Sequence, residues 1–223
     1  MTITRGAARA ELRVQLNETR ARRWGDDSLD AWLYEGCSDI ARKTESLQAV
    51  AEVPITGGVS TCEFPADMIR AHRVSALDST GNPVSDLRYR DLHTVNVSAW
   101  SSGLTGVPLQ YSMWGTPGNV QGTLYPTPAV DGSLVVYYYR LPTRPTLDSD
   151  ALEVPEGWER LPVLYAEYLA RRADRQPEWQ EAFQQYSSEL GSLFDMTRRH
   201  SDQAGSMGLD TSSHLPDWLI YDD

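Results

Sequence analysis

Histidine is the side chain most often used as a catalytic base at neutral pH, and here its positions match no known catalytic signature. The four histidines are His72, His93, His200 and His214. Nucleophilic catalysis needs a nucleophile, a base and an acid that orients the base, and no GxSxG elbow accompanies these histidines. The sequence therefore predicts no triad of the serine-hydrolase kind.

Metal and nucleotide chemistry are equally unsupported by residue spacing. Cys37 and Cys62 form no CxxC pair, and there is no HExxH, paired-histidine or EF-hand motif. Lys43 is the only lysine and is not part of a GKS or GKT motif, which excludes a P-loop. We expect no metal and no cofactor. The cysteines are expected to be two buried free thiols in a reducing compartment, with a disulfide between them as the alternative.

Carboxylates are the remaining chemical possibility, because Asp and Glu together number 31. A glycosidase-like pair would make the chain a carboxylate-dependent hydrolase, a class kept as an alternative although the sequence does not locate such a pair. The formal net charge of -11 argues against a general nucleic-acid coat, which needs clustered basic residues. The prediction is a non-enzymatic protein that binds other macromolecules.

Basic residues are concentrated at the start of the chain, and they suggest two readings. One is a solvated helix face, and the other is a docking arm for an acidic partner. Only Glu11 and Glu18 oppose these arginines in this stretch. The residues are Arg5, Arg9, Arg13, Arg20, Arg22 and Arg23.

The C-terminal stretch has a different character. Residues 202–213 are rich in Gly, Ser and Asp, and an apolar, aromatic end follows them. We interpret this end as a tethered docking peptide, with packing on its own domain as the alternative. The candidate partner-docking residues are therefore Arg5, Arg9, Arg13 and Arg20 at the start and Leu215, Trp218, Leu219, Ile220 and Tyr221 at the end.

The ends of the chain carry helical patterns. Leu12 and Leu16 stand i, i+4 in a first helix, and Asp26 or Asp27 is predicted to cap a second helix. Gly36 lies inside this second helix, where it costs about 1 kcal/mol relative to alanine; a close approach of another helix could justify it. A helical hairpin is predicted from Pro155 onward, with its second helix starting at Pro177.

Strand patterns fill the middle. Alternating residues 47–55 predict a strand, and Gly57-Gly58 predicts a hairpin turn to a partner strand over 59–64. The region 85–107 fits no single period. Further strands are predicted at residues 73–77, 108–114, 121–125 and 133–140.

This order predicts an α+β fold: an α-helical bundle built from the N- and C-terminal helices, with an inserted antiparallel β domain. The predicted units are residues 1–45 with 155–200 for the bundle, 46–154 for the β domain and 201–223 for an extended docking tail. No apolar run approaches the length of a membrane span, and no secretion signal is visible, so no membrane partner is expected.

Four stretches together resemble the head-to-tail adaptor (connector) proteins of tailed bacteriophages. Each combines a Trp, Pro or aromatic signal with an element boundary, and their order spans residues 10–190. They are Trp24–Leu33, Cys62–Ile69 followed by Val74, Leu124–Pro128 leading to Leu134–Pro142, and Leu152–Trp158.

The resemblance implies a virion protein without enzymatic activity or cofactor, assembled in the host cytoplasm and located at the portal vertex. Its partners would be eleven further copies in a twelve-fold ring, the portal protein and a tail-side protein such as a terminator, stopper or tube. Viral DNA would pass through the lumen without specific binding, which an acidic wall favours. A tail-tube gatekeeper or tail-completion protein is the alternative at a neighbouring position.

Overall fold

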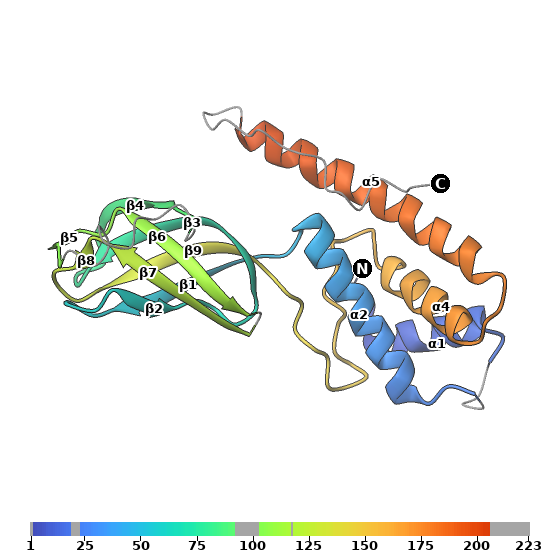
Figure 1. Cartoon of the computed structure of the whole chain (residues 1–223). Coiled ribbons are helices and arrows are strands. Elements are labelled where there is room, and N and C mark those ends of the chain that lie inside the picture. The colour runs from blue at the N-terminus through green and yellow to red at the C-terminus, as the bar shows by residue number, and fades with distance from the viewer. Residues whose placement is uncertain (1, 19–22, 92–102, 117, 206–223) are drawn as a thin grey trace.

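The computed structural model describes residues 2–18, 23–91, 103–116 and 118–205, with the backbone alone for 199–205. Helices gather at one end of the molecule and strands at the other (Figure 1). The helices are α1 (Arg5–Gln15), α2 (Asp26–Thr44), α4 (Leu161–Ala173) and α5 (Trp179–Gly205). The main strands are β1 (Gln48–Ile55), β2 (Thr61–Glu63), β3 (Met68–Asp78), β4 (Pro83–Tyr89), β6 (Gln110–Thr116), β7 (Asn119–Tyr125) and β9 (Gly132–Arg140), and the short β5 (Thr105–Gly106) pairs with β8 (Thr127–Pro128).

The first two helices start differently from one another. The side chain of Thr4 accepts a hydrogen bond from the backbone N–H of Ala7 at 3.3 Å, which caps α1. Helix α2 has Gly25 at its N-cap and no side-chain cap, so the predicted cap at Asp26 or Asp27 is wrong. Both carboxylates instead lie in the first turn, where they complement the positive end of the helix dipole.

Gly36 allows α2 and α4 to come together. A Cβ atom at this position would lie 3.1 Å from the Cα of Pro162 and 3.1 Å from the Cβ of Tyr165. Such contacts are too short for an unstrained carbon pair, so only glycine fits without a shift of α4. The close helix approach that could justify this glycine is present.

Helices α4 and α5 pack side by side and cover α2 (Figure 1). Their buried residues form a cluster with the C-terminal half of α2: Ile40, Leu161, Leu164, Tyr186, Leu190 and Leu193. A second cluster joins α1 to α2 and α4: Ala8, Leu12, Leu29, Leu33, Cys37, Leu152, Val163 and Ala166. Among the described residues, no helix is long and apolar enough to cross a membrane.

The seven main strands form one sheet in the order β1-β9-β3-β4-β6-β7-β2. A short turn at residues 56–60 joins β1 to β2, the two edge strands, and the sheet curls around its own core. Most neighbours are antiparallel, but β4 pairs with β6 in parallel, and so does β5 with β8. Its core contains Val53, Ile55, Cys62, Phe64, Met68, Val74, Ala76, Leu87, Tyr111, Leu124, Leu134, Val136 and Tyr138.

The hairpin predicted at Gly57-Gly58 does not form. Strand β1 pairs with β9 along its full length and β2 pairs with β7, so the turn connects two strands that are not paired. Gly58 has a φ of +79°, and its N–H donates to the carbonyl of Pro128 at 2.8 Å. A Cβ on Gly57 would lie 3.1 Å from the Cα of Val130. Gly57 is needed because another loop passes close by, which is a long-range reason that the local sequence does not reveal, and Gly58 is favoured by its positive φ.

A narrow neck joins the helical part to the sheet (Figure 1). The hydrophobic cluster of the sheet shares no residue with the two clusters of the helical part. Arg140 at the end of β9 donates to both carboxylate oxygens of Glu153, at 2.7 and 3.0 Å. Arg70 on β3 pairs with Glu45 just after α2. The two parts are thus tied by ion pairs across the neck rather than by a common core.

Cys37 and Cys62 are buried free thiols in different clusters, as the sequence predicted, and the disulfide alternative is wrong. Burial raises the pKa of each thiol to about 12. Both cysteines are therefore protonated packing residues at neutral pH.

Candidate docking surfaces

The N-terminal arginines lie on one side of α1, at i, i+4 and i+8, and face carboxylates from the same chain. Arg9 donates to Asp30 at 2.8 Å and to Asp148 at 2.6 Å. Arg5 donates to Asp148 at 2.7 Å, and Arg13 donates to Asp26 at 2.5 Å. We call these six residues the arginine ladder.

The arginine ladder is largely inaccessible. The side chains of Arg5, Arg9 and Arg13 are 17%, 14% and 11% exposed. The solvated-face reading is therefore wrong for these three arginines, which fasten α1 to the start of α2 and to the loop before α4. Whether they also contact a portal stays a prediction.

The electrostatics of the ladder follow from its contacts. Hydrogen bonds from Arg9 and Arg5 lower the pKa of Asp148, and a hydrogen bond from Arg13 lowers the pKa of Asp26. Burial raises the pKa of Asp30, against the lowering effect of Arg9 and Arg5. The Asp148 hydrogen bond raises the pKa of Arg9 in turn.

Beside the ladder lies a polar cavity of about 170 Å³. Two buried polar atoms of its walls, Nε of Arg5 and Oδ1 of Asp30, have no hydrogen-bond partner among the described residues. Its polar walls and volume suit ordered water, which commonly satisfies such groups. The other lining residues are Asp27, Tyr34, Arg144 and Pro145.

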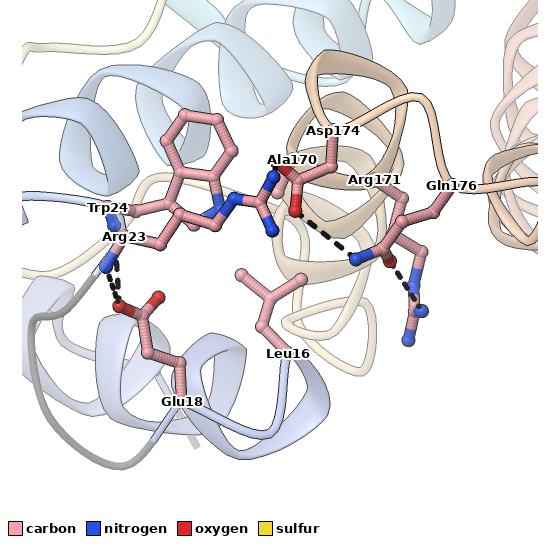
Figure 2. Close-up of a pocket in the computed structure, with 8 residues that line it drawn as sticks. All are labelled: Leu16, Glu18, Arg23, Trp24, Ala170, Arg171, Asp174 and Gln176. Carbon is pink, nitrogen blue, oxygen red and sulfur yellow. Dashed lines mark hydrogen bonds and ion pairs between the residues drawn. The ribbon is translucent and has the colours of Figure 1, made fainter.

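A second pocket of about 160 Å³ opens between the end of α1 and the end of α4 (Figure 2). Arg23 reaches Asp174 at 2.5 Å, and Gln176 donates to the same carboxylate at 3.2 Å. Trp24 and Leu16 supply apolar wall. Among the described residues, its lining contains no Ser, Thr, Cys or His and so offers no nucleophile with a base, and several of its polar groups bind one another.

The histidines that the sequence analysis considered for catalysis are not assembled into a site within the part of the chain that the structure describes. His72 is exposed and stacks edge-on against Tyr139 with ring centroids 5.9 Å apart. His93 and His214 lie outside the described residues. Within the described ranges, no group of three or more His, Cys, Asp or Glu residues could hold a metal ion. Asp26 and Asp30, whose pKa values shift in opposite directions, are held by guanidinium groups, which favours a structural role over that of the hydrolase pair.

Of the predicted docking residues, Arg20 and the C-terminal Leu215, Trp218, Leu219, Ile220 and Tyr221 lie outside the described residues. Their docking role stays a prediction. The structure brings Arg5, Arg9 and Arg13 together, but with partners that the sequence did not indicate: Asp26, Asp30 and Asp148.

One exposed apolar surface was missed from the sequence, at the end of the sheet farthest from the helices, near β5 and β8 (Figure 1). The exposed fractions are 44% for Val59, 52% for Leu104, 46% for Val107 and 70% for Val130. We call these four residues the sheet-tip patch. Backbone hydrogen bonds from Thr127 to Leu104 and from Ala129 to Gly106 hold its loops together. The available signal was an apolar residue beside each glycine or proline turn.

Comparison with known proteins gives one result that covers nearly the whole chain. No curated protein matches the sequence. The family model described as SU10 adaptor protein matches residues 3–209, a range that includes the arginine ladder, both parts of the fold and the neck. The chain therefore belongs to the SU10 adaptor protein family, and it is a structural adaptor of a bacteriophage particle.

Proposed function

We propose that this chain is the head-to-tail adaptor of its phage, a ring-forming protein that sits beneath the portal, extends the DNA channel and provides the platform for tail attachment. The observation that carries this proposal is the family match over residues 3–209. An adaptor in this position must hold different partners on its two sides.

The shape of the molecule suits that task. The helical part and the sheet have separate cores and point away from one another across the neck (Figure 1). The sheet-tip patch is an interaction site in this proposal, because exposed apolar side chains that lie together are typical of such sites, and we assign it to the tail-side protein. The helical part and the terminal segments would then meet the portal.

The charge of the chain fits a DNA channel. A net charge of -11 in each copy repels phosphate, so DNA can pass the ring without being retained. Twelve copies would multiply this repulsion around the lumen.

The test is to measure the mass of the purified chain alone and mixed with the portal of the same phage. The expected result is a portal-bound ring, and a variant that lacks residues 206–223 should bind the portal more weakly while its circular dichroism is unchanged. Labelled protein in intact particles should lie at the portal vertex. Label found farther down the tail would contradict the proposal and support the tail-tube gatekeeper or tail-completion role instead.

A further inference from the structure

Two arginines, one in strand β4 and one just after it, have no charged partner in the part of the chain that the structure describes. Arg88 follows the inward-pointing Leu87, and Arg90 comes two residues later, so both face away from the sheet core and both are exposed. The nearby Asp86 is already bound by Arg73, at 2.9 Å, and by Ser75, at 2.6 Å. Among the described residues, no carboxylate pairs with Arg88 or Arg90.

Helix α5 carries the opposite, unmatched charge. Its packed side consists of apolar residues such as Tyr186, Leu190 and Leu193, and acidic residues occupy its other sides. No lysine or arginine occurs between Gln176 and Thr197. The carboxylates are Glu178, in the turn just before the helix, and Glu181, Glu189 and Asp195 within it, and none of them forms an ion pair with another described residue.

We propose that these two surfaces meet between copies: Arg88 and Arg90 of one copy bind the carboxylates of α5 on a second copy. Complementary charges that stay unmatched within a chain favour such a contact, because they orient two surfaces and speed their encounter. The two surfaces are unlike and lie on different parts of the molecule. Contact between unlike surfaces can repeat from copy to copy and close into a ring.

The spacing of the groups is compatible with this contact. Two residues apart on a strand, Arg88 and Arg90 stand about 7 Å apart. Glu178 lies in the turn that leads into α5, where its carbonyl accepts a hydrogen bond from the N–H of Ala182 at 3.2 Å. It therefore stands near helical spacing from Glu181, and side chains three residues apart on a helix are about 5–6 Å apart. Long guanidinium side chains can therefore reach such a pair at the same time.

The inference deepens the proposed function, since it names the contact that would build the ring. The first experiment is charge reversal, followed by sedimentation of the full chain at low salt. R88E/R90E should weaken self-association about tenfold or more, and the loss should shrink toward 0.5 M salt, where such charges are screened. The variant E178R/E181R should show the same defect, and combining the four changes in one chain should restore association.

The second experiment uses the scarcity of lysine. A carbodiimide joins a lysine amine directly to a carboxylate, and the natural chain offers only Lys43. In R88K and R90K, mass spectrometry of a mixture of isotopically light and heavy copies should reveal links between copies from the introduced lysine to peptides within 177–198. The matched control is R144K, a replacement at an exposed arginine on the other side of the neck, which should give no such links.

The outcomes separate the contact from the ring. Rings of native mass whose crosslinks avoid α5 would overturn this contact and leave the proposed ring standing. A chain that stays monomeric at millimolar concentration in low salt would show that the two surfaces do not bind each other without the portal, and it would overturn the inference. If R88E/R90E leaves self-association unchanged but abolishes binding to a short DNA duplex, then the arginines serve phosphate and the inference is wrong.

Discussion

Helix α1 and strand β4 both carry arginines, but their surroundings make these arginines different groups. Arg5, Arg9 and Arg13 are mostly buried and bind three carboxylates of their own chain. Arg88 and Arg90 are exposed and bind none of the described ones. A cluster of charge in a sequence therefore does not by itself indicate a docking site; what matters is whether the fold supplies the opposite charges.

The largest expected difference in the free energy of unfolding is between replacing a buried arginine of the ladder and replacing an exposed arginine at β4. R9Q removes hydrogen bonds to Asp30 and Asp148 and leaves Asp30 partly buried with fewer partners. Because hydrogen bonds to charged groups contribute about 1.5–3 kcal/mol, we expect the free energy of unfolding to fall by about 2 kcal/mol. Urea denaturation measures it.

The matched control for that experiment is R88Q. An exposed side chain without a charged partner should change the free energy of unfolding by less than about 0.5 kcal/mol. Equal losses in R9Q and R88Q would show that the two groups of arginines do not differ in the way that their contacts indicate.

Two glycines inside helices offer the same comparison with a smaller effect. An alanine Cβ at Gly36 would press on the backbone of Pro162, while one at Gly191 in α5 would meet nothing within 4 Å. Both replacements gain about 1 kcal/mol of helix propensity. At Gly36 the overpacking should cost about 1–3 kcal/mol and outweigh that gain.

Thermal denaturation should therefore give a lower melting temperature for G36A and a higher one for G191A. If both variants were stabilised, α2 and α4 would not approach as closely as the Cβ positions require.

The sequence predicted most of the elements because their patterns are local. Alternation marked β1, high strand propensity marked β9, and apolar spacing marked α2 and α5. Strand β4 was missed because Leu87 is its only fully buried side chain, which is too little to produce a period. The partners of the arginine ladder were missed for another reason: Arg9 and Asp148 are 139 residues apart, and only the tertiary fold brings them together.

The difference between local patterns and contacts made by the tertiary fold also decides which surfaces can be found from the sequence. Gly36 was noticed because a glycine inside a helix breaks a local rule, and the structure supplies the reason. Arg88 and Arg90 break no rule, since arginines on the outer face of a strand are ordinary. Their importance depends on the absence of a nearby carboxylate among the described residues, and this is a property of the surroundings alone.

Acid should loosen α1 before it affects the core of the sheet. Arginine hydrogen bonds lower the pKa of Asp148 and Asp26 in the folded chain, so their stabilising contribution is complete above the unfolded value of about 4 and is lost as the pH falls below it. Asp30, whose pKa is raised, acts in the opposite direction and partly offsets this loss. Hydrogen exchange of the α1 amides between pH 6 and pH 3 should show faster opening at the acid end.

The variant pair D26N and D27N isolates the ladder from the helix dipole, because both carboxylates lie in the first turn of α2 but only Asp26 is bound by Arg13. D26N should speed the exchange of α1 amides already at pH 6 and reduce their further response to acid. D27N should leave the exchange of α1 nearly unchanged, since it removes a similar dipole interaction without breaking an ion pair. Equal effects of the two replacements would mean that the charge of the helix terminus, and not the ladder, holds α1 in place.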